Sequence, residues 1–340
     1  MEGTFRGTYC YTWSTEFILL FFFRYETGVI GTAANPPPMM NKKSFTLATG
    51  FVLLWNSGFI GAEYGLPYTE PFTLLFWRYL TLTVLVLVYL LVRDRFWWVG
   101  WKAAGMNMLI GVLAHGVWLA CVLLALDNEI PAGIVAMVVA LQPLATGALS
   151  GSVTGERTHF LQWIGLSLGF AGVVLSVAFR IDFDSYTSVF GYLIPLGSVI
   201  SITLATLLQR RMELMRSALE LPVDLTLFYQ CLATMVACAW PALFVEQLST
   251  YWEPTFIVTM IWLVLAVSLG AYSLMWLLIK RLSATRLASL FYLGAPLTML
   301  MAWVAFGDQV QIMDIVGLAV VFTGVILSQF ETGEDYQDVS

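Results

Sequence analysis

Charged residues are scarce in this chain. Lysine, arginine, aspartate and glutamate together make up 11% of its 340 residues, whereas hydrophobic residues make up 59%. In soluble domains charged residues alone account for about 25% of the composition. So few charges exclude a water-exposed globular fold. The composition instead predicts an all-α membrane protein with several spans, because backbone polar groups in lipid must be hydrogen-bonded within each segment.

Histidine and cysteine are also rare, which limits the chemistry available to the chain. There are two histidines, His115 and His159. The four cysteines show no metal-ligand spacing and, after the first, lie in apolar runs, as small apolar residues do: Cys10, Cys121, Cys231 and Cys238. We therefore expect no cofactor and no metal. A membrane enzyme would need clustered acids, histidines or a nucleophile beside its base, and is disfavoured.

Ten apolar segments are long enough to span a bilayer, which takes about 20 residues. They cover residues 45–63, 72–92, 103–126, 131–151, 159–179, 190–209, 223–245, 256–279, 284–306 and 311–330. Residues 1–43 are expected to form an N-terminal extension, disordered or translated from an over-extended start, with Met39 or Met40 as the natural first residue. Its run Phe17–Phe23 is too short to span. Residues 331–340 are expected to form an acidic tail.

The cations indicate the orientation of the spans. Alternate loops and ends on one side carry twelve: Lys42, Lys43, Arg93, Arg95, Lys102, Arg157, Arg210, Arg211, Arg216, Lys280, Arg281 and Arg286. The other side carries Arg180 alone. The positive-inside rule then predicts that both termini are cytoplasmic. Trp97, Trp98, Trp101 and Trp252 lie at segment ends, where tryptophans anchor helices at the membrane interface.

The stretch from Leu141 to Leu175 recurs from Gly294 to Leu327. Both copies carry an early proline, a Gly-acid pair and two glycines seven residues apart: Pro143, Gly155-Glu156, Gly165 and Gly172, then Pro296, Gly307-Asp308, Gly317 and Gly324. This predicts two five-helix repeats, 44–180 and 190–330. An odd number of helices per repeat inserts the second repeat upside down, a plan typical of secondary transporters.

These features together resemble the EamA-like transporters of the drug/metabolite transporter superfamily. Besides the duplicated elements, the resemblance rests on Trp55-Asn56-Ser57-Gly58-Phe59 in the first segment and on Pro71 and Arg78 in the second. It covers nearly all of residues 44–330. The second copy departs from the first by having Asp308 where the first has Glu156.

The resemblance implies export or exchange of small polar metabolites, amino acids prominent among them, by alternating access in the inner (plasma) membrane. Two alternatives stay open: a superfamily relative that carries nucleotide sugars, drugs or other solutes, and a polytopic membrane enzyme. A channel is disfavoured by the duplicated plan. The expected partners are a small-molecule substrate and the lipid bilayer, without nucleic acid, and the chain is expected to be a monomer or a homodimer.

Polar or amphipathic groups inside apolar segments are the candidates for lining a substrate cavity. They are Trp55, Asn56, Arg78, His115, Trp118, Gln142, Ser198, Ser201, Tyr272, Trp276 and Tyr292. Arg78, a cation about two turns into its segment, either contacts a substrate carboxylate or has a structural role at the interface. His115 shares a helix face with Gly111 and Trp118; it either lines a cavity or forms a hydrogen bond between helices.

The remaining intramembrane signals are prolines, glycines and a lack of acids. Pro143 and Pro296 are expected to break their helices at equivalent places beside a midplane site, or else to bend them for packing. The paired glycines are expected to allow close helix contact, within the chain or in a dimer. No acid lies near the middle of a segment, so uniport or exchange is expected rather than a carboxylate proton relay. Asp314, near a segment end, is expected to contact water.

Overall fold

The described part of the chain folds into helices only. The computed structural model describes residues 42–154, 160–178, 186–214, 221–279, 290–291 and 293–329, and the N-terminal extension and the acidic tail lie outside them. In order along the chain the helices are α1 (Lys42–Gly65), α2 (Pro71–Val92), α3 (Trp101–Gly111), α4 (Trp118–Asp127), α5 (Ala132–Val139), α6 (Gln142–Thr154), α7 (Phe160–Ala178), α8 (Tyr186–Leu214), α9 (Val223–Phe244), α10 (Pro254–Ile261), α11 (Tyr272–Ile279), α13 (Gly294–Phe306) and α14 (Ile312–Gln329).

One 3₁₀ turn and two π-helical segments join some of these helices. The 3₁₀ turn η1 (Leu66–Tyr68) follows α1. The π-helical segments η2 (Val112–Val117) and η3 (Trp262–Ala271) connect α3 to α4 and α10 to α11, so that each makes one long rod with its neighbours. Such π segments tend to occur at functional sites.

Six of the described helical rods are long and apolar enough to cross a membrane. They cover Ser44–Tyr68, Pro71–Val92, Trp101–Asp127, Val189–Gln209, Val223–Phe244 and Pro254–Met275. Four shorter apolar helices, Ala132–Thr146, Trp163–Ser176, Gly294–Phe306 and Ile312–Gly324, lie within the other four expected segments. Each long rod buries half or less of its apolar window, and large apolar side chains such as Val92 and Val304 are exposed. The chain is therefore a multi-pass membrane protein.

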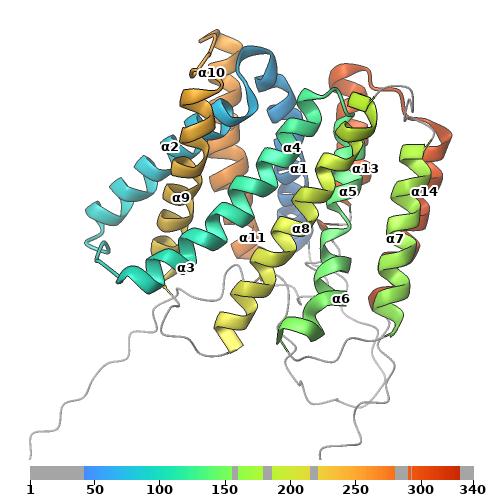
Figure 1. Cartoon of the computed structure of the whole chain (residues 1–340), viewed down its shortest axis with the longest axis horizontal. Coiled ribbons are helices and arrows are strands. Elements are labelled where there is room, and N and C mark those ends of the chain that lie inside the picture. Colours follow the sequence, from blue (N-terminus) through green and yellow to red (C-terminus); the bar gives the residue numbers. More distant parts are fainter. Residues whose placement is uncertain are drawn as a thin grey trace, which may run out of the picture.

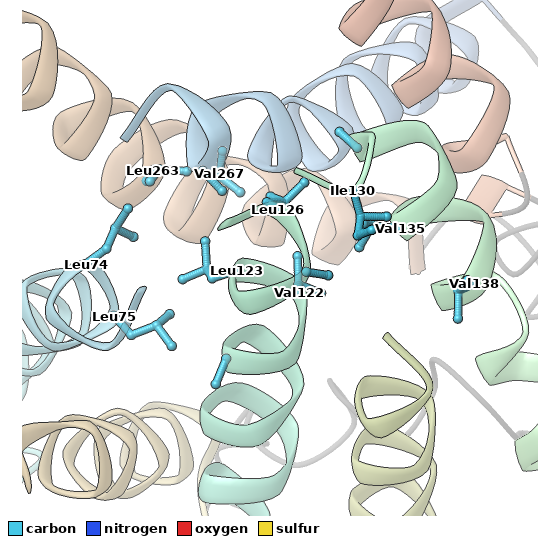
Figure 2. Close-up of a cluster of buried hydrophobic side chains, with 14 of the residues drawn as sticks. Leu74, Leu75, Val122, Leu123, Leu126, Ile130, Val135, Val138, Leu263 and Val267 are labelled. Atoms are coloured by element: carbon cyan, nitrogen blue, oxygen red, sulfur yellow. The ribbon is translucent and has the colours of Figure 1, made fainter. Parts of the chain in front are cut away.

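The helices pack as an elongated bundle (Figure 1). α2 lies against α9, α8 against α4 and α6, α5 against α13, and α1 against η3, α11 and α13. At one edge α7 and α14 lie side by side along their length. In the interior, Leu74 and Leu75 of α2, Leu123 of α4 and Leu263 of η3 are fully buried and point toward one another (Figure 2).

The seam between α7 and α14 is built on glycines. A Cβ on Gly172 would come within 2.5 Å of the Gly317 carbonyl oxygen, and a Cβ on Gly324 within 2.5 Å of the Gly165 carbonyl oxygen. The helices therefore run antiparallel with their backbones in contact, which glycine permits because it has no side chain. This pattern accounts for the four paired glycines as a contact within the chain.

One end of the bundle, which we call the basic end, gathers cations at the end of α2, the start of α3 and the end of α8 (Figure 1). Arg95, just after α2, forms an ion pair with Asp224 in the first turn of α9, with 2.9 Å between Nη1 and Oδ2. Lys102 lies in the first turn of α3 and Arg211 in the last turn of α8. Trp97, Trp98 and Trp101, at the same end, are exposed.

The opposite end is tied together by the loop that follows α9. The Glu246 carboxylate accepts hydrogen bonds from the Phe72 and Thr73 backbone N–H groups at 3.0 and 2.6 Å and from the Thr73 hydroxyl at 2.7 Å. It thereby caps the N-terminus of α2, where backbone donors lack helical partners. In the same loop Thr250 forms an isolated antiparallel bridge with Thr69.

The expectation that Asp314 contacts water is wrong. Its side chain is 1% exposed and is not in water. Asp314 is the third residue of α14, and its Oδ2 accepts a hydrogen bond from the backbone N–H of Gln311 at 2.8 Å. An acid at this position reaches back to the residue that precedes the helix, so the carboxylate caps α14 and was mistaken for a surface group.

Candidate functional site

Two adjoining chambers lie inside the bundle. The arginine chamber, lined by Arg78, Tyr79 and Ser268 among others, has about 840 Å³ of empty space. The glutamine chamber, lined by Gln142, Gln209 and Gln230 among others, has about 1020 Å³. Gln209 lies near the end of α8, so the glutamine chamber reaches toward the basic end.

Four aromatic residues, which we call the aromatic divider, line both chambers: Trp55, Phe59, Trp118 and Tyr272. The Trp55 and Trp118 rings stack with centroids 6.5 Å apart and planes 25° apart, and Tyr272 meets Trp55 edge-on at 5.4 Å. α1, α4 and α11 thus each contribute a ring to the boundary. These are broad, flat surfaces against which the apolar part of a small molecule can lie.

The two π segments carry the polar groups beside the divider. His115 lies in η2 and Ser268 in η3. Ser268 follows His115 by 153 residues, the same interval that separates Pro143 from Pro296. The hydroxyl of Ser201, on the neighbouring helix α8, donates a hydrogen bond to the backbone carbonyl of Leu113 in η2 at 2.7 Å. A wide turn therefore occurs in both rods where they pass the chambers, with its free carbonyls satisfied by side chains.

Arg78 is buried in the arginine chamber with 7% of its surface exposed. Its Nε and Nη2 both donate to the Ser268 hydroxyl oxygen, at 3.2 and 2.9 Å. Ser268 in turn donates to the Leu263 carbonyl at 2.9 Å. Among the described residues no carboxylate lies within ion-pair distance of the guanidinium and no acidic side chain lines either chamber. The cation is thus held by one neutral hydroxyl.

His115 connects the divider to α9. It lines both chambers, and its Nε2 lies 3.2 Å from Oε1 of Gln230. Its ring centroid lies 5.8 Å from that of Tyr79, the residue after Arg78. The histidine therefore both lines the cavity and bridges two helices, so the two roles expected as alternatives occur together in one side chain.

Asn56 contributes to the glutamine chamber and joins α1 to α13. Its Nδ2 donates to the Val52 carbonyl at 2.7 Å, and its Oδ1 accepts from the Thr298 hydroxyl at 3.2 Å. A Cβ on Gly294 would lie 2.7 Å from the same Oδ1, so the first turn of α13 packs directly on this amide. Asn56 thus fixes the start of α13 against α1.

The two prolines lie just past breaks in the helical path. α5 ends at Val139, a turn covers residues 140–141, and Pro143 is the second residue of α6. Pro296 is the third residue of α13, after a turn at Leu293. Proline is tolerated in a first helical turn, where its missing N–H has no helical acceptor to lose. Residues of both first turns, Gln142 and Ala295, line the glutamine chamber.

Two expected lining residues lie elsewhere, and two lie outside the described atoms. Ser198 and Ser201 of α8 are buried but line neither chamber; the Ser198 hydroxyl donates to the Pro195 carbonyl at 2.6 Å. The side chain of Trp276 and the whole of Tyr292 fall outside the described part of the chain.

Sequence reasoning also missed Gln230 and Ser268. Both are polar residues in apolar helices, the signal that selected the other candidates.

Comparison with known proteins shows that the chain is similar to proteins named as transporters. Residues 42–178 match the family model described as the EamA-like transporter family. "Uncharacterized transporter YvbV" of Bacillus subtilis is 27% identical over 59% of this chain and 64% of its own length. "Uncharacterized inner membrane transporter YedA" of Escherichia coli is 30% identical over 36% of this chain and 40% of its own length. The matches thus span less than two thirds of these two relatives.

Two further matches cover almost the whole of the compared protein. A "Probable amino-acid metabolite efflux pump" of Escherichia coli is 20% identical over 86% of this chain and 96% of its own length. A solved crystal structure, 20% identical, superposes with a TM-score of 0.59 over 85% of this chain and 98% of that one. At this identity the superposition indicates a shared fold.

Proposed function

We propose that this chain, which belongs over residues 42–178 to the EamA-like transporter family, exports or exchanges small metabolites across the inner membrane, most fittingly amino acids or related compounds. The observation that carries the proposal is the pair of adjoining chambers inside a bundle of apolar helices, lined by aromatic rings and a few polar groups. The name of the efflux-pump relative supports amino acids and related compounds as the solute class.

The proposed architecture is ten spanning helices in two inverted five-helix repeats. The reciprocal glycine contacts between α7 and α14 support it. Gly317 and Gly324 follow Gly165 and Gly172 by 152 residues, and Gly172 meets Gly317 while Gly165 meets Gly324. A two-fold axis perpendicular to two antiparallel helices produces this exchange of partners. Such an axis in the membrane plane relates inverted repeats.

The proposed mechanism is alternating access about the chambers. The proline turns before the main parts of α6 and α13 lie at equivalent places in the two repeats, and both abut the glutamine chamber. Interrupted helices at the interface of two repeats commonly form the solute site of secondary transporters. The gathering of cations at the basic end supports placing that end, and both termini, in the cytoplasm.

Lining chemistry favours this function over the alternatives. A nucleotide sugar or another phosphorylated solute would need several cations, and Arg78 is the only one among the described lining residues. An enzyme would need an acid, base or nucleophile set; the described lining offers His115 without a neighbouring acid.

Counterflow in proteoliposomes tests the proposal. Vesicles containing the purified protein are loaded with one unlabelled amino acid at a time, a trace of the same compound in labelled form is added outside, and its accumulation inside the vesicles is followed. Accumulation that saturates with solute concentration, with the solute recovered chemically unchanged, supports a carrier. A non-saturable flux would point to a channel, chemical conversion of the solute to an enzyme, and no flux with any amino acid or related metabolite would contradict the proposal.

A further inference from the structure

The described lining residues of both chambers supply hydrogen-bond donors and include no acidic acceptor. Arg78 provides a guanidinium whose partner is the single hydroxyl of Ser268. The indole Nε1 of Trp118, in the aromatic divider, is buried without an acceptor within hydrogen-bond distance. In the glutamine chamber the Nε2 atoms of Gln142 and Gln230 are likewise buried without acceptors. A guanidinium and an indole N–H can only donate, so this excess of donors does not depend on a protonation state.

The surroundings of Arg78 argue against a purely structural role. An arginine that snorkels to the interface keeps its head in water, whereas Arg78 is 7% exposed and is bonded across the bundle to η3. A buried cation is stabilised by a paired anion with good geometry, and a single neutral hydroxyl is a weak substitute. Because Leu74 and Leu75, one turn earlier on α2, are fully buried, the cation also lies beside apolar packing rather than a wet surface.

We propose that the two chambers bind organic carboxylates, with the carboxylate on the Arg78 guanidinium and the apolar body of the ligand against the aromatic divider. The guanidinium matches a carboxylate in geometry and charge. An ammonium group would find no acid among the described lining residues, only the faces of Trp55, Trp118 and Tyr272. The ligand's carboxylate is therefore the recognised group, and an α-ammonium group is not required.

The inference deepens the proposed transport function and rests on it for movement across the membrane, whereas binding can be measured separately. The probes are 3-phenylpropionate, phenylalanine and phenethylamine, which share a phenyl body and are respectively an anion, a zwitterion and a cation at neutral pH. Their affinities for the purified full chain in detergent are measured by calorimetric titration. We expect 3-phenylpropionate to bind most tightly and phenethylamine most weakly.

Substitution of the arginine isolates its contribution. Arg78→Gln should weaken binding of 3-phenylpropionate about ten- to hundredfold, the effect of losing a charged hydrogen bond, without weakening phenethylamine. Arg78→Lys should retain part of the affinity because it keeps the charge. Arg95→Gln, the same substitution at the basic end, should leave both affinities unchanged. Trp118→Phe, which keeps a ring and removes the N–H, should weaken the carboxylate several-fold.

The outcomes separate the binding site from the transport function. Phenethylamine binding as tightly as 3-phenylpropionate, no binding of 3-phenylpropionate, or unchanged affinity in folded Arg78→Gln would each overturn the carboxylate site. If Arg78→Gln does not fold, the order of the three probes on the wild-type protein and on Arg78→Lys decides. Carboxylate-selective binding without counterflow would sustain the site while refuting transport; counterflow that prefers phenethylamine would do the reverse.

Discussion

The seam between α7 and α14 gives a prediction whose size can be worked out from contacts. An alanine at position 172 would place its Cβ 2.5 Å from the Gly317 carbonyl oxygen and 2.9 Å from the Val321 backbone nitrogen. Both are backbone atoms of α14 and cannot rotate away. The helices must separate, and overpacking of this kind costs about 1–3 kcal/mol.

A matched control removes the intrinsic effect of the substitution. Glycine to alanine inside a helix is favourable by about 1 kcal/mol through helix propensity alone. Gly105 lies inside α3, and nothing lies within 4 Å of where its Cβ would be. Gly105→Ala should therefore be neutral or stabilising. Gly172→Ala should be less stable than Gly105→Ala by about 1–3 kcal/mol, the cost of the contact itself.

The reciprocal contact sharpens the test. Gly324→Ala would meet the Gly165 carbonyl oxygen at 2.5 Å and the Gly169 backbone nitrogen at 2.9 Å, nearly the same surroundings as at position 172. The two single variants should lose similar stability. Because both substitutions push the same two helices apart, the loss in the double variant should be smaller than the sum of the single losses.

Unfolding in mixed micelles, with increasing mole fraction of sodium dodecyl sulfate and tryptophan fluorescence as the signal, gives the free energies of unfolding. Gly172→Ala as stable as Gly105→Ala would refute the backbone contact. A difference of more than about 1 kcal/mol between Gly172→Ala and Gly324→Ala would refute the equivalence of the two contacts, because an overpacked contact costs only about 1–3 kcal/mol in total.

Three further predictions concern the opposite end and the divider. Glu246→Ala removes the carboxylate that caps α2 and should lower the free energy of unfolding by about 1–3 kcal/mol in the same micelle assay. Burial, and then the carboxylates of Asp127 and Glu246, raise the pKa of Glu70 above its ordinary 4.5, so ionised Glu70 disfavours the fold. Glu70→Gln should therefore match the wild type in thermal stability below about pH 4.5 and exceed it as the pH rises above that value; equal stability at all pH values would contradict this. Trp55→Ala removes the ring that contacts both Trp118 and Tyr272 and should reduce counterflow at unchanged membrane yield, measured against the wild type in proteoliposomes.

Much of the helical layout could be predicted from hydrophobic runs, because a segment in lipid has no stable alternative to the helix. Six expected segments correspond to long helical rods. The break near Pro143 was expected too, but its position was not. Pro143 is the second residue of α6, so the turn lies before it, at residues 140–141. In a first helical turn the proline has no helical hydrogen bond to lose, whereas within a continuous helix its ring would deform the preceding turn.

The site was only partly predictable because its polar partners depend on local backbone geometry. Nothing in the run from Trp262 to Ala271 distinguishes a π segment from an α-helix, yet the wider turn sets where Ser268 meets Arg78. Ser198 and Ser201 were chosen by the same rule as Asn56, but a serine hydroxyl can satisfy itself on a nearby helical carbonyl. Short side chains therefore give the weakest sequence signal for a cavity.

If the proposed two-repeat architecture holds, the exchanged glycine partners along α7 and α14 also carry a trace of ancestry. Two identical five-helix chains facing each other across a two-fold axis would form one such seam, in which the contact between the Gly165 and Gly172 equivalents occurs twice, as in a symmetric homodimer. Fusion of two such genes would preserve the interface without designing a new one. The divergence between the copies would then have been free to accumulate in the chambers, where one half kept a histidine at the wide turn and the other a serine.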